Sequence, residues 1–363
     1  MIGQVRHETL FDYALVEPLT RKPELDTLRI VSGYASHAMA SHHILEANRR
    51  KHALSVDLVY GMAGMDGVKK IDHLGFLSLE KKREFDFAGS FACSYVKRPK
   101  SVHSKVYVWC KGEVPVCAFM GSANYTEYGF DESNRIETLT ECDPISAYEF
   151  FLKTKPLAVD CSHVNQETDF PEKLRRMQLP MKHDPVVMIE TDPDSPYKGC
   201  LKIIVSLLIE KGAKAGTVGE GSRLNWGVLA DGSPRRNIKD DPNSSTRDPN
   251  QAYIALPTPI QRSGFFPEYN TLAKGADGQK RFSVMTDDGV VFSCVRVSGD
   301  YGKEIETPQD NSELGRYFRN RLGLPSGAFI TAQDLKRYGR YDVTFYKLDD
   351  ENYVMDFSRP KAK

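Results

Sequence analysis

Polar residues in two short segments could do chemistry together. The segments are V-H-S-K-V-Y-V-W at residues 102–109 and G-S-A-N-Y-T at residues 121–126. Valines alternate with polar and aromatic residues in the first segment, which is typical of a strand. Side chains in a strand have a period of two, so we expect His103 and Lys105 side by side on one face. The second segment ends the next apolar run, and pairing of the two strands would bring Asn124 close to both.

An imidazole, an ammonium and a carboxamide on a sheet edge can cleave a phosphodiester without a metal ion. In this interpretation His103 attacks phosphorus, while Lys105 and Asn124 hold the non-bridging oxygens as charge builds on them. Ser122 adds a hydrogen bond. A carboxylate must orient the imidazole, and Glu137, in R-I-E-T-L on the next expected strand, is the candidate. We therefore predict a catalytic site that needs no metal and no cofactor.

The alternative is that these residues belong to an ordinary strand and an ordinary turn. A lone H-x-K would favour that alternative. The G-S-A-N segment at this spacing, between two β-runs and followed by a glutamate, favours the catalytic interpretation. His42 and His43 lie in an expected helix and are better explained as surface residues of that helix.

Composition limits the class of protein. A chain of 363 residues predicts two domains, and 40% hydrophobic residues can bury a core in each. Lys+Arg and Asp+Glu are both 49, which excludes a globally basic protein but leaves room for a local basic face. The seven cysteines have no C-x-x-C spacing, so we expect neither a zinc site nor a disulfide framework. With no signal peptide and no apolar stretch of membrane length, we expect a cytoplasmic protein.

The first half has strands alternating with helices, which predicts an α/β domain over residues 1–156. The expected strands and helices are 28–34, 55–60, 85–96, 102–109, 114–120 and 136–140, and 39–51, 71–83 and 144–153. Residues 157–184 are polar and weakly periodic, which predicts a linker with one short helix near 172–177.

The second half, residues 185–363, predicts a mainly β domain, either a barrel or a sandwich. Strand-like runs are separated by Gly, Pro, Asn and Asp clusters at 186–190, 201–209, 252–256, 281–286, 290–297, 341–348 and 353–357. Helices are expected only at 312–322 and 331–338.

Polar loops in this half carry side chains of the types that read base edges and hold phosphates. The candidate DNA-binding residues are Arg223, Asn225, Trp226, Arg235, Arg236, Asn250, Lys303 and Asn311. Solvated surface is the alternative for such loops, and for Trp226 packing in the barrel core is an equally good interpretation. We expect Arg316, Arg319 and Arg321 to form a solvated or phosphate-facing helix surface.

The segment H-x-K followed by G-S-x-N resembles the phospholipase D superfamily, whose half-motif is H-x-K-x-x-x-x-D and then G-S-x-N. His103, Lys105, Ser122 and Asn124 match, but the aspartate position falls on Cys110. That departure makes Glu137 the candidate for the missing carboxylate. The motif occurs once, so the chain is similar to members that build one site across a homodimer. The resemblance implies that one subunit's histidine attacks while the partner's histidine protonates the leaving oxygen.

The order of the later motifs resembles the NgoFVII-type restriction endonucleases. These motifs are L-N-W-G, A-Y-I-A-L-P, F-F-P, D-D-G and N-S-E-L-G-R-Y-F-R. In that family a phospholipase D-like nuclease domain precedes a B3-like pseudobarrel, which reads duplex DNA with two loop arms. The resemblance implies arms near residues 219–250 and 300–311.

The expected function is that of a type II-like, site-specific DNA endonuclease of a restriction–modification system, with a phosphohistidine intermediate. The resemblance implies three partners: double-stranded DNA, a second copy of the chain and a cognate DNA methyltransferase. Relatives can also act with a helicase-like ATPase. Two alternatives stay open, a lipid-acting or non-specific phosphodiesterase and a catalytically decayed DNA-binding regulator, the latter supported by Cys110 alone.

Overall fold

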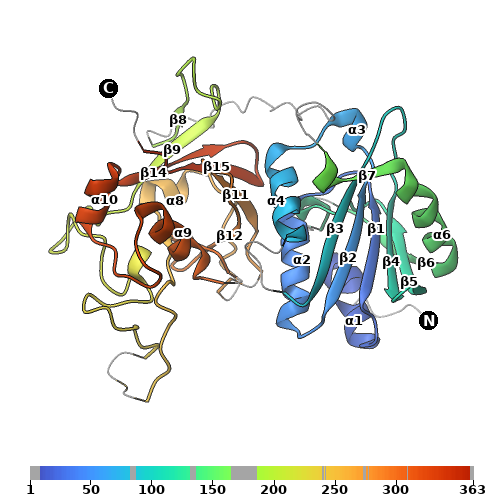
Figure 1. Ribbon diagram of the computed structural model, residues 1–363, viewed down its shortest axis with the longest axis horizontal. Coiled ribbons are helices and arrows are strands. Elements are labelled where there is room, and N and C mark those ends of the chain that lie inside the picture. Colours follow the sequence, from blue (N-terminus) through green and yellow to red (C-terminus); the bar gives the residue numbers. More distant parts are fainter. Residues whose placement is uncertain are drawn as a thin grey trace. The chain divides into compact units, whose positions relative to one another are not determined.

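The chain folds into two compact units, residues 1–174 and 175–363, each described by itself below (Figure 1). The computed structural model describes residues 9–81, 87–130, 136–164, 186–238, 241, 243–272, 275–276, 278–308 and 310–359. Most of the expected linker, including the helix near 172–177, lies outside these residues. The start of the linker is a correction, because residues 158–160 form a strand that pairs antiparallel with the first sheet.

Seven strands among the described residues of the first unit form one mixed sheet in the order β6-β5-β4-β1-β2-β3-β7. Strands β1, β2 and β3 are parallel, whereas β4 runs antiparallel to β1 and each further neighbour reverses again. The bounds are β1 Thr27–Ser32, β2 Leu54–Tyr60, β3 Gly89–Val96, β4 Lys105–Lys111, β5 Val114–Gly121, β6 Leu139–Cys142 and β7 Ala158–Asp160.

Helices cover both faces of this sheet, so the expected α/β architecture is confirmed (Figure 1). Helices α2 and α4 pack on one face and α6 on the other. The helical segments are η1 Asp12–Val16, α1 Glu17–Arg21, α2 His37–Arg49, α3 Ala63–Asp66, α4 Lys70–Glu80, α5 Glu127–Phe130, α6 Pro144–Thr154, η2 Lys155–Leu157 and η3 Cys161–His163. The Asp143 carboxylate caps α6 by accepting from Ser146 N–H, and Pro144 occupies the first turn.

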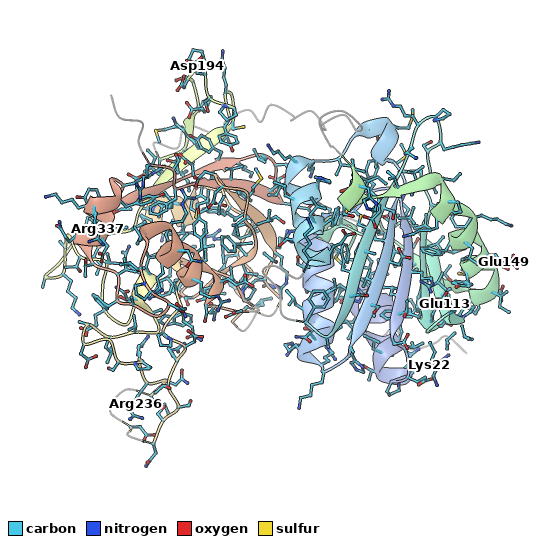
Figure 2. All side chains as sticks on the ribbon, viewed as in Figure 1. Lys22, Glu113, Glu149, Asp194, Arg236 and Arg337 are labelled. Atoms are coloured by element: carbon cyan, nitrogen blue, oxygen red, sulfur yellow. The ribbon has the colours of Figure 1, made fainter. Side chains whose placement is uncertain are left out.

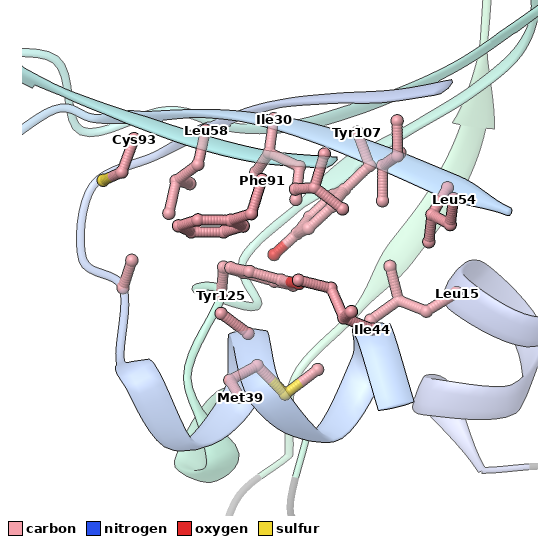
Figure 3. Packing of buried hydrophobic residues seen from close by; sticks show 14 of the residues in the cluster. Leu15, Ile30, Met39, Ile44, Leu54, Leu58, Phe91, Cys93, Tyr107 and Tyr125 are labelled. Carbon is pink, nitrogen blue, oxygen red and sulfur yellow. The ribbon is translucent and has the colours of Figure 1, made fainter. Parts of the chain in front are cut away.

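Strand β4 is buried on both faces, and its valines and aromatic residues alternate between the faces as the sequence predicts. Val106 and Val108 pack toward α6, while Tyr107 and Trp109 pack in the cluster beneath α2. Figure 3 shows the ring of Tyr107 between the sheet and α2. A central strand between two helical layers needs apolar side chains on both faces. The strand begins at Lys105, so the expected start at residue 102 is wrong and His103 lies before the strand.

Eight strands among the described residues of the second unit form a mixed sheet, in the order β10-β13-β12-β11-β15-β14-β9-β8. Only β11 and β15 pair in parallel. The bounds are β8 Met188–Ile189, β9 Leu201–Ser206, β10 Ile254–Ala255, β11 Phe282–Thr286, β12 Val291–Val297, β13 Glu304–Glu306, β14 Asp342–Lys347 and β15 Asn352–Asp356. The helical segments are η4 Arg223–Asn225, α8 Thr258–Arg262, α9 Glu313–Leu322 and α10 Ala332–Tyr338. The sequence analysis missed β13 and α8, which are three and five residues long.

The arginines of α9 correct an expectation, because they hold the fold together. Arg319 is fully buried and donates to the carbonyls of Gly315 and Ala328, and to those of Leu224 and Pro249. It therefore fixes both ends of the loop that follows η4. Arg316 pairs with Asp310, and Arg321 pairs with Asp287 and Asp288. These guanidinium groups are committed to partners within the chain.

Candidate active site and nucleic-acid interface

All five candidate catalytic residues lie at one edge of the first sheet. The parallel strands β1 to β3 end at this edge, and β4 begins there because it runs antiparallel to β1. Strand β5 returns to the same edge at Gly121, and β6 starts from it at Leu139. The edge therefore holds His103 just before β4 and Lys105 as the first residue of β4. It also holds Ser122 and Asn124 after β5, and Glu137 before β6.

His103 and Lys105 contact each other directly. The Lys105 Nζ lies 3.2 Å from His103 Nε2 and also donates to the His103 carbonyl at 2.7 Å. An ammonium has only donors, so this contact requires Nε2 to present its lone pair. The His103 residue is exposed, whereas Lys105 is 7% exposed. Burial lowers the pKa of Lys105, and the negative charge of Glu137 opposes that effect.

Asn124 lies close to His103 through the segment that follows β1. Its Oδ1 accepts from the Tyr34 N–H at 3.0 Å. The Tyr34 ring packs edge-on against the His103 imidazole, with centroids 5.6 Å apart. A Cβ on Gly33 would lie 2.7 Å from His103 Cδ2 and 3.3 Å from Asn124 Oδ1. Only glycine at position 33 lets the three segments approach this closely.

Gly33 and Tyr34 are site residues that the sequence analysis missed. The available signal was the glycine directly after the first strand, in V-S-G-Y. The Tyr34 hydroxyl donates to the Asp66 carboxylate, and this hydrogen bond and burial raise the pKa of Tyr34 to about 12. At neutral pH the Tyr34 side chain is therefore uncharged, and its ring packs beside the imidazole.

Ser122 and Glu137 make contacts that the sequence does not predict. The Ser122 Oγ accepts from the Thr138 N–H at 3.0 Å, so Ser122 holds the segment that carries Glu137. Glu137 precedes β6 and is half-buried. Within the described residues, no hydrogen bond joins its carboxylate to His103, and its charge acts on Lys105. Glu137 is thus a counter-charge for Lys105, and its expected role in orienting the imidazole stays a prediction.

Cys110, at the motif's aspartate position, lies at the opposite end of β4. It is five positions along the strand from Lys105, which corresponds to ~17 Å. The thiol is fully buried, and burial raises its pKa to about 11. A side chain at position 110 cannot orient the imidazole, so the missing aspartate is no sign of a decayed site.

Two of the candidate DNA-binding residues are structural, which corrects the expectation for them. Asn225 is fully buried, with its amide bonded to the Gly219 carbonyl and to both polar backbone groups of Ile330. Asn250 is 7% exposed and bonds Ser326 and Gly327. Neither side chain has free hydrogen-bonding groups to offer to a base edge.

The other candidates lie on loops in which they keep some exposure. Arg223 and Arg235 are half-buried and donate to the carbonyls of Leu208 and Gly221. Arg236 is exposed and donates to Ser244, and Figure 2 shows it far out on a long loop. Lys303 is exposed, 3.8 Å from Glu304. The buried Oδ1 of Asn311 has no hydrogen-bond partner among the described residues.

Trp226 and Arg247 form a stacked pair that the sequence analysis did not identify. The Arg247 guanidinium lies 4.3 Å from the centroid of the half-buried Trp226 ring. Arg247 also donates to Gln251 Oε1 at 2.9 Å. Trp226 packs edge-on against Tyr253 and lies outside the core cluster of this unit. Burial raises the pKa of Glu306 to about 7, with Glu304 adding to the effect and Arg247 opposing it.

A metal-binding arrangement is absent from the five candidate residues, which include a single carboxylate. Among the described residues, one group of three possible ligands lies elsewhere in the unit and comprises Glu80, Asp160 and Cys161. Among the helices that the structure describes, none is long and apolar enough to cross a membrane.

Two family models match the chain. Residues 8–168 match the NgoFVII restriction endonuclease N-terminal PLD domain, and residues 200–349 match the NgoFVII C-terminal B3-like DNA-binding domain. Among solved structures, NucT from Helicobacter pylori matches with 16% identity over 37% of this chain and 82% of its own, at a TM-score of 0.26. That score is too low to support an argument. No curated protein sequence matches the chain.

Proposed function

Because the chain belongs to the NgoFVII restriction endonuclease family, with a PLD nuclease domain and a B3-like DNA-binding domain, we propose that it cleaves duplex DNA at specific sites by a metal-independent, covalent mechanism. One observation carries the proposal: four polar residues of the two motif segments, and Glu137, lie at one edge of the first sheet. His103 is exposed there, with its Nε2 directed at Lys105.

The reaction has two displacements at phosphorus. In the first, His103 Nε2 attacks phosphorus and a P–N bond forms, while the bond to the leaving oxygen breaks. His103 of the partner subunit gives that oxygen a proton. In the second, water attacks phosphorus and loses a proton to the partner's His103. The P–N bond then breaks and releases the first imidazole, so both histidines return to their starting states.

The neighbours of His103 stabilise the crowded phosphorus. Lys105 and the amide of Asn124 bind the non-bridging oxygens, where negative charge accumulates in the transition state. Lys105 has to move its ammonium from Nε2 to the phosphate when the substrate arrives. The negative charge of Glu137 favours the charged form of that buried ammonium and opposes the effect of burial.

Cleavage in excess EDTA tests the chemistry. The purified chain should cut duplex DNA carrying its site without added metal or ATP, because the proposed site uses imidazole, ammonium and amide groups. His103→Ala and Lys105→Ala should abolish cutting and keep sequence-specific binding. Strict dependence on Mg²⁺, with an ATP-driven helicase-like partner absent, would show that the mechanism is wrong.

A homodimer through the first unit follows from the single motif, since the reaction needs two histidines. Co-expression of wild-type and His103→Ala subunits tests this. In a composite site both histidines are required, so the activity should fall as the square of the wild-type fraction. A linear fall, or full activity from a monomer in sedimentation, contradicts the dimer.

The proposed setting is a restriction–modification system in the cytoplasm, where a cognate DNA methyltransferase protects host DNA. Methylated and unmethylated copies of the same target, compared in one digest, test this setting. The expected result is cleavage of the unmethylated copy alone.

A further inference from the structure

We infer that the loop between β3 and β4, residues 97–104, holds the backbone of the scissile strand through Lys97 and Lys100. We call this segment the basic loop. The inference rests on the proposed function and assigns the DNA contact of the nuclease unit itself. Its ligand is the phosphodiester backbone on either side of the bond that is cut.

The sequence of the basic loop concentrates charge next to the nucleophile. It reads K-R-P-K-S-V-H-S, with three cations in the four residues 97–100 and His103 three residues later. Lys97, Arg98 and Lys100 are all exposed. In a chain with no net charge, phosphate affinity must come from local groups of this kind.

The loop is fixed to the sheet edge at several points. The N–H groups of Lys97 and Val102 donate to the carbonyls of Leu157 and Gly61, at 3.1 and 3.0 Å. Arg98 donates from Nε to the Gly64 carbonyl at 2.7 Å and from Nη2 to Met65 at 3.3 Å. These bonds attach the loop to α3 and to the end of β2, so its cations are held on an ordered backbone.

Two glycines make this close attachment possible. A Cβ on Gly61 would lie 1.9 Å from the Val102 carbonyl oxygen. A Cβ on Gly64 would lie 2.7 Å from the Val96 carbonyl oxygen. Both contacts are with backbone atoms that cannot move away cheaply. The chain therefore accepts two unusually close approaches to place this loop beside His103.

The side chains of the two lysines have no carboxylate partner among the residues that the structure describes. Arg98 uses its donors on backbone carbonyls, whereas neither Lys97 nor Lys100 forms an ion pair with any carboxylate that the structure describes. An exposed ammonium without a carboxylate partner costs the fold little and is free to bind a phosphate.

The position of the loop matches the course of a bound strand. In the sheet order, β1 and β2 separate β4 from β3, a span of three strand spacings or ~14 Å. The basic loop crosses this span from the end of β3 to His103. A DNA strand with one phosphate at His103 can therefore place further phosphates over the loop.

The test uses the full chain with Lys97 and Lys100 both changed to Gln. Affinity for the target duplex and the rate of its cleavage are both measured over about 50–200 mM salt. Phosphate contacts dominate the salt dependence in this range. The slope of log affinity against log salt should decrease by about one for each lysine removed. The rate at saturating protein should stay within about twofold of wild type, because the lysines bind the strand and do not take part in the chemistry.

Lys111→Gln is the matched control. Lys111 is an exposed lysine at the opposite end of β4, away from the site edge. It should keep the wild-type slope. A double variant with the wild-type slope, or with the same change as Lys111→Gln, overturns the inference.

A binding experiment distinguishes failure of this inference from failure of the proposed function. Salt titrations of duplex binding are repeated with both lysine changes in a His103→Ala chain, which needs no cleavage. If wild type fails to cut DNA but the lysine changes still reduce the slope, the proposed function is wrong and the basic loop still binds DNA. If wild type cuts and the slope is unchanged, the basic loop is the part that is wrong.

Discussion

At the scale of single residues, His103 is bounded by packing, and no carboxylate of the described residues hydrogen-bonds to its imidazole. One side of the imidazole contacts the Lys105 ammonium, and another contacts the edge-packed ring of Tyr34. Tyr34 is held in turn by Asp66 and by Asn124. A nucleophile without a charged orienter depends on such walls, because a small displacement of the attacking atom is costly in rate.

Tyr34 should therefore act as a positioning residue. Tyr34→Ala removes the ring and should lower the single-turnover rate on the order of 10- to 100-fold at unchanged DNA affinity, since misplacement affects the attack and not the binding. Tyr34→Phe keeps the ring and loses only the bond to Asp66, so its rate should stay within a few-fold of wild type. Single-turnover cleavage and gel-shift titration check both. Equal losses in the two variants would contradict a role for the ring.

Restoring the aspartate of the motif should not help catalysis. Position 110 is ~17 Å of strand away from Lys105, and Arg29 lies close enough to affect the Cys110 thiol. Cys110→Asp should fold with reduced stability, because it buries a carboxylate whose neighbour Arg29 already pairs with Glu113. The cleavage rate should match that of Cys110→Ser. A gain in rate in the aspartate variant alone would return the decayed-nuclease hypothesis to consideration.

At the scale of elements, helix α2 supports the site from below. His43 on this helix bonds the Tyr125 hydroxyl and the Leu15 carbonyl, and Tyr125 directly follows Asn124. His37, at the start of the helix, bonds Ser41 through its ring and Asp72 through its backbone N–H. Both imidazoles are buried, so the expectation that His43 lies on the helix surface is wrong. The helix therefore helps to hold the strand exit that carries the amide of the site.

Acid should destabilise the first unit through this helix. Burial lowers the pKa of His37 and of His43 to about 3, whereas the unfolded chain binds these protons near pH 6.5. Their contribution to stability is therefore complete above pH 6.5 and is lost as the pH falls toward 3. At pH 5 the loss is about 2 kcal/mol for each histidine.

Thermal unfolding of the full chain between pH 7 and pH 5 measures this effect. A chain with His37 and His43 both changed to Asn should be less stable at pH 7 and should lose less stability on acidification. His42→Gln is the control, since His42 is half-exposed on the same helix and pairs with Glu127. Identical pH dependence in all three proteins would argue against the buried histidines as the cause.

Local motifs and periodicity are sufficient to predict most elements of the first sheet and the proximity of three candidate site residues. His103, Lys105 and Asn124 come from two segments that pair as neighbouring strands, so short-range spacing places them together. Gly33 and Tyr34 lie some seventy residues earlier, and their approach depends on the register between β1 and β4. The sequence pattern carries no information about that register.

The polar loops of the second unit show the same limit more severely. An asparagine that reads a base and one that holds a loop have identical local sequences. The side-chain amide of Asn225 hydrogen-bonds to the backbone of Ile330, more than a hundred residues later. Only the fold identifies this partner. The sequence is equally consistent with Trp226 in the core and Trp226 on the DNA surface. Its place beneath Arg247 depends on the path of the long loop between them.

At the scale of the whole molecule, the net charge of zero implies a division of labour. No global field draws the chain to DNA, so each unit needs its own local cations. In the first unit these are the lysines of the basic loop, which contact backbone and carry no sequence information. In the second unit a candidate is Arg247, whose half-buried guanidinium is stacked on Trp226 and bonded to Gln251.

Changes in the two units should therefore separate cleavage from recognition. Arg247→Ala should reduce discrimination between target and scrambled duplexes by about 1–3 kcal/mol, the contribution of one bidentate contact to a base. Arg247→Lys should not restore it, because an ammonium lacks the flat face that stacks on indole. His103→Ala should keep full discrimination and cut nothing.

Arg337→Ala is the control, an exposed arginine of α10 paired with Asp334 (Figure 2). Competition gel shifts measure discrimination at one fixed salt concentration. If Arg247→Ala discriminates like wild type while Arg223→Ala or Arg235→Ala does not, recognition belongs to the neighbouring arginines, and the stacked pair only supports their loop.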